Sequence, residues 1–146
     1  MFGKADLMNK QCPRPINVIV VDDDIDTREY ISSAMFRWKK SGFEFNFCYA
    51  VDGQDCLEQM EKEPIDIVIS DVKMPRMDGK ELVKKIRSKN NPNRKVPIIV
   101  ISAYDDLFKE SGLEMEHPNI FVMGKPFELD EFYSKIRTSA LMAAGN

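Results

Sequence analysis

Four short apolar runs of the sequence end in side chains that could do chemistry together. The residues at or just after the ends of these runs are Asp22, Asp23, Asp71, Ser102 and Lys125. Three carboxylates held close together repel one another unless protons or a divalent cation neutralise them, and oxygen ligands suit magnesium, which keeps part of its water. A cation, an ammonium and a hydroxyl around a nucleophilic carboxylate are the groups that phosphoryl transfer to an aspartate requires.

Each of these residues also has a plain structural explanation. Asp71 could start a turn, the acids after residue 21 could cap a helix, Ser102 could end a strand, and Lys125 could be a surface charge. The functional interpretation therefore depends on whether the fold brings the four strand ends together.

Five apolar segments have the length and the β-branched content of strands: residues 16–21, 43–49, 65–70, 96–101 and 120–123. Five helical segments alternate with them, and each connection is long enough for a crossover. This alternation predicts an α/β fold, with one parallel sheet covered by helices on both faces. Right-handed crossovers and the half-polar pattern of 43–49, typical of an edge strand, give the strand order 2-1-3-4-5 of a doubly wound, flavodoxin-like fold.

The helical segments show apolar residues at core spacing. Asp24 or Asp26 is expected to cap a first helix that buries Tyr30, and a short helix is expected over 105–112. The last helix carries an apolar stripe that includes Leu129. In an open sheet of this kind the reactive crevice lies beyond the carboxyl ends of the strands. Neighbouring strands are about 4.8 Å apart, so Asp22, Asp23, Asp71, Ser102 and Lys125 are expected to meet there.

The length, composition and net charge of the chain argue against several classes of function. A chain of 146 residues with 43% hydrophobic and 31% charged residues suits one globular domain, here 16–146, after a loosely held tail, 1–15. The net charge of -3 argues against direct binding of nucleic acid. No apolar run reaches membrane-spanning length and the first residues lack the apolar core of a signal peptide, so no membrane contact and a cytoplasmic location are expected.

The cysteines predict neither a zinc site nor a disulfide framework. Cys12, Cys48 and Cys56 form no Cys-x-x-Cys pair, and the chain holds one histidine, His117, in a loop-like segment. Cys56 is expected to fill a small space in the core.

Four ordered motifs point to a family. They are VDD at 21–23, DVKMPRMDG at 71–79, VISA at 100–103 and KPF at 125–127. Together they closely resemble the receiver domain of two-component response regulators, the CheY-like group, over roughly residues 16–142.

The resemblance implies that Asp71 accepts a phosphoryl group from a histidine kinase or a histidine phosphotransfer protein. It further implies that Asp22, Asp23 and Asp71 hold Mg²⁺ or Mn²⁺, with the backbone carbonyl of Lys73 as another ligand.

By the same resemblance, Lys125 pairs with the phosphoryl group, Ser102 swings its hydroxyl onto it, and Ala103 belongs to the same contact region. Lys73 and Tyr104, two residues beyond Asp71 and Ser102, occupy positions that tune how fast the phosphoryl group is hydrolysed.

The sequence departs from the family pattern in three places. Val122 stands where the family usually has an aromatic switch residue, and Phe121 is one place earlier. The spacing from Ser102 to Lys125 is one residue longer than usual. Residues 113–119 also lack the usual Gly-Ala turn, which suggests a face shaped for its own partner.

The resemblance implies a switch in the face formed by helix 4, strand 5 and helix 5. About 20 residues follow Lys125, so the expected output is a separate downstream effector, unless the chain is a fragment of a longer protein. A monomer or a phosphorylation-linked dimer is expected. Small phosphodonors could also be used, and the chain could hydrolyse its own phosphoaspartate without being a turnover enzyme.

Three other functions remain open at this stage. A magnesium-dependent phosphatase with an aspartate nucleophile, of the haloacid-dehalogenase type, needs Asp-x-Asp-x-Thr, but Thr27 comes one place late and no cap domain is present. A calcium loop on Asp22, Asp24 and Asp26 lacks the glycine and the glutamate that such loops need at positions six and twelve. A phosphorylation-independent scaffold would have no use for the intact acids and lysine.

Overall fold

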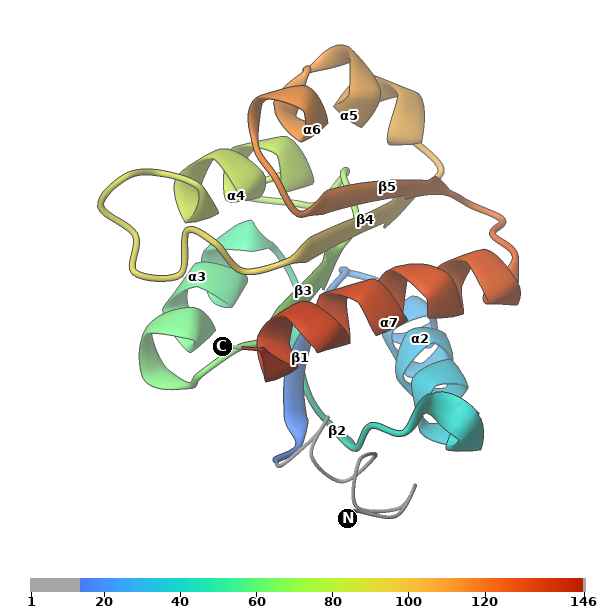
Figure 1. Ribbon diagram of the computed structural model, residues 1–146. Helices are drawn as coiled ribbons and strands as arrows, with labels where there is room; N and C mark the ends of the chain where they lie inside the picture. Colours follow the sequence, from blue (N-terminus) through green and yellow to red (C-terminus); the bar gives the residue numbers. More distant parts are fainter. Residues whose placement is uncertain (1–13, 146) are drawn as a thin grey trace.

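The computed structural model describes residues 14–145, and residues 1–13 and 146 lie outside this description (Figure 1). The expected tail over 1–15 and Cys12 therefore fall almost wholly outside the described residues.

The described chain forms one five-stranded parallel sheet. Its strands are β1 (Ile16–Val21), β2 (Phe45–Ala50), β3 (Ile67–Ser70), β4 (Ile98–Ser102) and β5 (Ile120–Gly124). Their order across the sheet is β2-β1-β3-β4-β5, with every neighbouring pair parallel. The predicted fold class and strand order are confirmed, including β2 as an edge strand.

Helices cover both faces of the sheet. They are α2 (Ile25–Arg37), α3 (Gly53–Lys62), α4 (Gly79–Ile86), α5 (Asp105–Glu110), α6 (Leu113–Glu116) and α7 (Leu129–Ala144), with a short 3-10 helix, η1 (Lys39–Ser41). Figure 1 shows α2 and α7 together on one side, α3 and α4 on the other, and α5 with α6 beside β5.

Aspartates fix the beginnings of three of these helices. The side chain of Asp24 accepts a hydrogen bond from the backbone N–H of Asp26 and caps α2, as one of the two sequence alternatives predicted. Asp52 caps α3 and Asp78 caps α4 in the same way. Because each helix follows a strand, these capped N-termini all lie at the carboxyl edge of the sheet.

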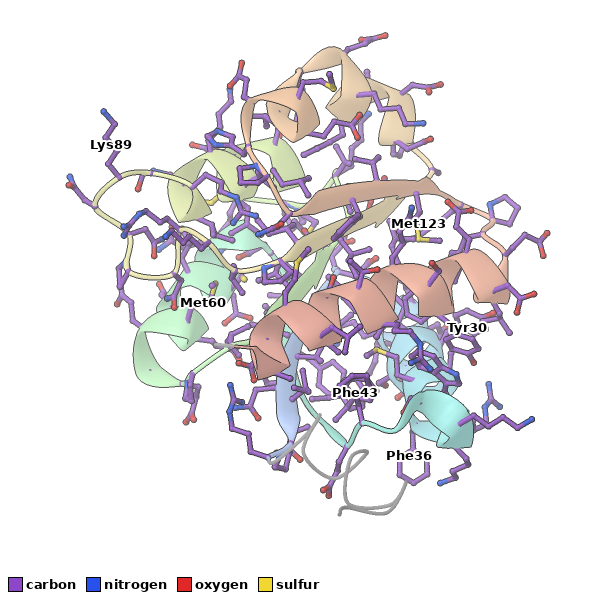
Figure 2. All side chains as sticks on the ribbon, in the orientation of Figure 1. Tyr30, Phe36, Phe43, Met60, Lys89 and Met123 are labelled. Carbon is purple, nitrogen blue, oxygen red and sulfur yellow. The ribbon has the colours of Figure 1, made fainter. Side chains whose placement is uncertain are left out.

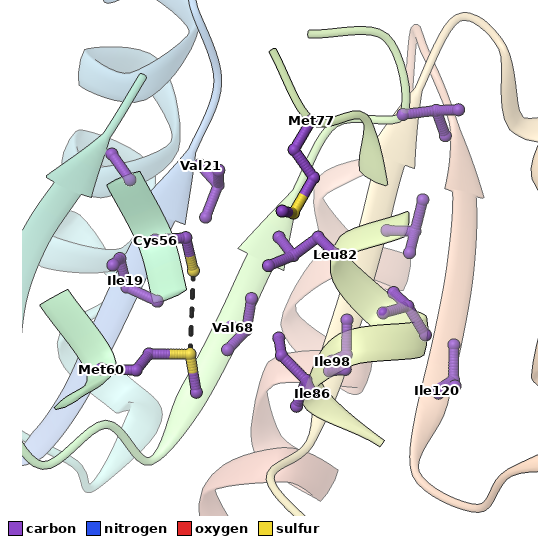
Figure 3. Close-up of a cluster of buried hydrophobic side chains, with 14 of the residues drawn as sticks. Ile19, Val21, Cys56, Met60, Val68, Met77, Leu82, Ile86, Ile98 and Ile120 are labelled. Carbon is purple, nitrogen blue, oxygen red and sulfur yellow. Dashed lines mark hydrogen bonds between the residues drawn. The ribbon is translucent and has the colours of Figure 1, made fainter. Parts of the chain in front are cut away.

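The two faces of the sheet hold separate apolar cores. One core joins the sheet to α3, α4, α5 and α6, and Figure 3 shows Met77, Leu82 and Ile86 directed toward its centre. The other core joins the sheet to α2 and α7, and Met123 of β5 belongs to it (Figure 2). Cys56 is fully buried, as predicted, with its thiol 3.8 Å from the sulfur of Met60.

Three details differ from the sequence prediction. The helix expected over 105–112 is present as α5, which ends at Glu110, but a further short helix, α6, follows it after Gly112, whose left-handed conformation (φ 75°) separates the two. Tyr30 is 49% exposed and Leu129 is 40% exposed. Tyr30 packs the edge of its ring against Phe127 rather than entering the core.

Among residues 14–145, no helix combines the length and the apolar character that crossing a membrane requires.

Candidate functional site

Lys125 lies between two aspartates at the carboxyl edge of the sheet. Its ammonium is 3.2 Å from Oδ2 of Asp22 and 3.5 Å from Oδ2 of Asp71. The lysine is separated from these acids by 103 and 54 positions, yet all three follow directly on strands. The parallel topology alone therefore brings the three charges together.

The backbones of both aspartates are held by the neighbouring strand. The N–H of Asp22 donates to the carbonyl of Ala50, and the N–H of Asp71 donates to the carbonyl of Val21, each at 3.0 Å. Oδ1 of Asp71 accepts a 2.6 Å hydrogen bond from the N–H of Val72. The carboxylate of Asp71 is thus fixed on one oxygen, and its other oxygen faces Lys125.

Asp22 is almost completely buried, with 3% of the residue exposed. Burial is the main cause that raises the pKa of its carboxyl above the ordinary value, and the negative charge of Asp71 raises it further. The backbone N–H of Asp24 and the ammonium of Lys125 act in the opposite direction. The site therefore holds more negative charge than its one lysine neutralises, and a further cation would relieve this excess.

The three predicted metal-binding acids, Asp22, Asp23 and Asp71, differ in how far they are exposed to solvent. Asp23 is exposed, in contrast to its buried neighbour Asp22. In the described part of the chain, no three Asp, Glu, His or Cys side chains gather closely enough to hold a metal ion by themselves. The donors present are carboxylate and carbonyl oxygens, and this fits Mg²⁺, which binds through one or two carboxylates and keeps several waters.

Ser102 and Lys125 are linked through the backbone. The N–H of Lys125 donates to the carbonyl of Ser102 at 3.0 Å, which aligns the ends of β4 and β5. Ser102 is fully buried and its hydroxyl oxygen accepts a hydrogen bond from the N–H of Tyr104. Ala103 between them is exposed.

The loops after β3 and β4 meet through Lys73 and Tyr104. The ammonium of Lys73 lies 4.3 Å from the centre of the Tyr104 ring, a distance at which a cation is attracted to the ring face. The two predicted rate-tuning positions are therefore in direct contact.

The strand β5 explains why Phe121 does not take the aromatic position that Val122 leaves open. Successive residues of a strand point to opposite faces. Phe121 packs with the core of α2 and α7, whereas Val122 packs with the core of α3 to α6. Phe121 therefore lies on the wrong face to substitute for an aromatic side chain at 122.

Gly79 makes the close packing behind Asp71 possible. A Cβ atom built at this position would lie 2.2 Å from the carbonyl oxygen of Asp71. The N–H of Gly79 donates to the carbonyl of Val72 at 2.7 Å, so the loop 71–79 closes back on its own start.

Sequence reasoning missed an ion pair next to this loop. Arg76 donates to both carboxylate oxygens of Asp52, from Nε at 2.6 Å and from Nη2 at 3.1 Å. The rule that placed Asp22 and Asp71 at the functional edge would also have placed Asp52 there, because it follows β2.

The chain is similar in sequence to one family over most of its length. The family model for the response regulator receiver domain matches residues 18–137. The response regulator MprA of Mycolicibacterium vanbaalenii is 31% identical over 124 residues, which are 84% of this chain and 49% of the relative. The chain therefore spans about half the length of this curated relative.

Solved structures resemble the fold as well. The chemotaxis protein CheY4 of Vibrio cholerae is 25% identical, with a TM-score of 0.65 over 86% of this chain and 99% of that one. The receiver domain of a sensor histidine kinase of Pseudomonas aeruginosa, solved with a magnesium ion in its active-site cleft, is 21% identical, with a TM-score of 0.68 over 88% and 99%.

Proposed function

The chain belongs to the response regulator receiver domain family, and on this premise we propose that Asp71 accepts a phosphoryl group from a histidine kinase or a histidine phosphotransfer protein. The observation that carries the proposal is the position of Lys125 within 3.5 Å of both Asp22 and Asp71. A carboxylate that is fixed at one oxygen and faces an ammonium is suited to be a nucleophile whose product gains negative charge.

The transfer follows from this geometry. A carboxylate oxygen of Asp71 attacks phosphorus, and the bond between phosphorus and the imidazole nitrogen of the donor breaks. That nitrogen keeps the bonding electron pair and takes up a proton from solvent. With acetyl phosphate as the donor, the bond from phosphorus to oxygen breaks and acetate leaves. Lys125, whose ammonium is 3.5 Å from Oδ2 of Asp71, then compensates the charge of the new acyl phosphate.

Asp22, Asp23 and Asp71, with the carbonyl of Lys73, are the groups that would hold Mg²⁺ or Mn²⁺. When bound, the ion neutralises charge on the phosphoryl oxygens. Two features of the chain support this assignment: the excess negative charge around Asp22 and the exclusively oxygen donors. The structurally similar Pseudomonas aeruginosa domain, which was solved with magnesium in its active-site cleft, agrees with it. Asp23, being exposed, would act through a water molecule or after a small change of rotamer.

The response would pass through Ser102. Rotation of its side chain toward the phosphoryl group breaks the hydrogen bond from the N–H of Tyr104, and the loop over Ala103 follows. This loop leads into α5, so the face of α5, α6, β5 and α7 changes its packing, with a coupling of about 1–3 kcal/mol. Because position 122 holds a valine, no aromatic ring at that position moves together with the hydroxyl of Ser102. The change in conformation therefore depends on Ser102 alone.

We further propose that the output is read by a separate effector and that the chain acts as a phosphoacceptor switch, monomeric or dimeric upon phosphorylation. The curated relative MprA is about twice as long as the matched region, so the function of that whole protein is not transferred to this chain.

Phosphorylation with a small donor tests the proposal. The chain is incubated with acetyl phosphate and MgCl₂, and the mass increase of one phosphoryl group is followed on the intact protein, then located by peptide mapping after borohydride reduction. Labelling is expected on Asp71, and no labelling is expected when EDTA is present from the start of the reaction.

Two variants sharpen the result. Asp71→Asn removes the nucleophile and should abolish labelling, whereas Asp66→Asn, at the opposite edge of the sheet, should label like the wild-type chain. Undiminished labelling of Asp71→Asn, or a label mapped to another residue, would refute the assignment. Continuous release of phosphate from a small phosphoester at many turnovers would favour the phosphatase alternative instead.

A further inference from the structure

The loop 71–79 is fastened at its far end by the ion pair between Asp52 and Arg76. Arg76 has a left-handed backbone, with φ 61°, which is uncommon for a residue with a side chain. Asp52 is only 2% exposed, although the side chain of Arg76 is 59% exposed. A buried carboxylate thus holds an otherwise solvent-facing residue in an unfavourable backbone conformation.

Asp52 is itself rigidly held. Its Oδ1 accepts a hydrogen bond from the N–H of Asp55 and caps α3. The two hydrogen bonds from Arg76 are the first cause of a lowered pKa of this carboxyl, so it is charged at neutral pH. The anchor of the loop is therefore the N-terminus of a helix, not a mobile side chain.

Backbone contacts and packing add to the same connection. The N–H of Gly53 donates to the carbonyl of Met77 at 3.1 Å. The side chain of Met77 is buried and fills the space over Gly53, where a Cβ atom would come within 2.8 Å of its Cγ. Figure 3 shows Met77 directed into the same core as Val21 and Leu82. The residue after Arg76 is thus fixed, and Arg76 is the point at which the chain turns from Pro75 into the core.

We infer that Asp52 and Arg76 are positioning residues for the metal side of the site: their ion pair fixes the turn that presents the backbone carbonyl of Lys73. This inference rests on the proposed function of that site. Lys73 and Arg76 are three positions apart in a loop that closes between Val72 and Gly79. Because the other end of the segment is fixed at Asp71, a change in the conformation of Arg76 has to be absorbed by residues 73–75.

The chain contains a matched control. Arg14 forms a bidentate pair with Asp66, at 2.7 and 2.9 Å, and Asp66 also accepts a backbone hydrogen bond, from the N–H of Asn17. This pair is bidentate like that of Asp52 with Arg76, but Asp66 precedes β3 and so lies at the opposite edge of the sheet from Asp71.

Mg²⁺ binding to the unphosphorylated chain, measured by isothermal titration calorimetry, tests the inference on Asp52→Asn, Arg76→Asn and Asp66→Asn. Asparagine at 52 still accepts the capping hydrogen bond, and asparagine at 76 tolerates the left-handed backbone. We expect about tenfold weaker Mg²⁺ binding for both variants at 52 and 76, as is usual for residues behind a metal ligand, and a change within about twofold for Asp66→Asn.

Comparison of Asp52→Asn with Arg76→Asn distinguishes an effect of loop geometry on Mg²⁺ affinity from an effect of charge. Asp52→Asn removes a negative charge and would weaken cation binding by electrostatics alone, whereas Arg76→Asn removes a positive charge and would strengthen it. Weakening in both is therefore expected only if the pair acts through geometry. At saturating Mg²⁺, labelling by acetyl phosphate should return to nearly the wild-type rate in both.

The remaining outcomes distinguish failure of the positioning role from failure of the proposed function. Opposite effects of the two variants, unchanged affinity in both, or equal weakening in Asp66→Asn would each overturn the positioning role and leave the proposed function intact. Absence of Mg²⁺ binding and of labelling in the wild-type chain would overturn the proposed function itself. If Asp52→Asn does not fold, Arg76→Asn at its mostly exposed position still gives the decisive measurement.

Discussion

The ammonium of Lys73 and the ring of Tyr104, 4.3 Å apart, join the loop that follows Asp71 to the loop that follows Ser102. Both side chains are exposed. They form a contact across the site that connects β3 to β4 beyond the last hydrogen bonds of the sheet.

Replacement of the ring tests its role in hydrolysis. Tyr104→Ala should shorten the lifetime of the phosphoaspartate about two- to tenfold, because a difference of about 1 kcal/mol in barrier corresponds to this range and removal of the ring admits water. The decay is followed by loss of the phosphoryl mass after the donor is removed. Tyr49→Ala, a similarly exposed tyrosine on β2, is the control. An unchanged lifetime would show that the ring is no barrier.

Removal of the central lysine should expose the repulsion between the two acids. Lys125→Gln is expected to lower the free energy of unfolding by about 1–2 kcal/mol at about pH 7. The loss should shrink as the pH falls, because burial raises the pKa of Asp22 and protonation of the folded state then removes its charge.

Urea unfolding at about pH 7 and about pH 5 measures this change. Lys109→Gln, which removes an exposed pair 3.4 Å from Asp105 on α5, should change stability by less than about 1 kcal/mol. An equal loss at both pH values would contradict the account.

A methyl group at position 79 should press directly on the backbone of Asp71, the proposed phosphoacceptor. Gly79→Ala places a carbon 2.2 Å from the carbonyl oxygen of Asp71, so we expect a loss of about 1–3 kcal/mol in stability and a severalfold slower labelling. Gly145→Ala, where the nearest atom is 3.5 Å away, should leave both unchanged. Thermal unfolding and the labelling assay give the comparison.

Acid should release the pair of Asp52 with Arg76. The pKa of Asp52 is lowered from its ordinary value of 3.8, first by the hydrogen bond from Arg76. Its contribution to stability is therefore present above pH 3.8 and is lost as the pH falls below this value, through the lowered pKa. The wild-type chain should melt about 2–4 °C above Asp52→Asn at neutral pH, and the two melting curves should converge in acid. A constant difference would show that the pair is not responsible.

The strand order and the meeting of Asp22, Asp71 and Lys125 could be predicted because both depend on topology. Parallel strands with right-handed crossovers allow few arrangements, and a residue that directly follows a strand inherits its place at the edge. The capping of α2 by Asp24 was predictable for a similar reason, because the requirement is local.

The remaining features depend on contacts that no local pattern reveals. Asp52 and Arg76 are 24 positions apart, and Arg76 has a left-handed backbone where it meets its partner, a conformation that its residue type does not favour. The separation of α6 from α5 comes from one glycine, Gly112, in a left-handed conformation. Leu129 is placed at core spacing, but it is the first residue of α7 and is 40% exposed.

The strand β5 is the second edge strand of the sheet, opposite β2, and its residues alternate between the two cores. Each of the three inner strands is bonded on both sides, whereas β5 shares a single ladder with β4. A sideways shift of β5 would therefore disrupt one row of hydrogen bonds and reach both helical layers at once. Ser102 and Lys125 lie at the end of that one row, so a disturbance that begins with either residue first meets a strand that a single ladder holds.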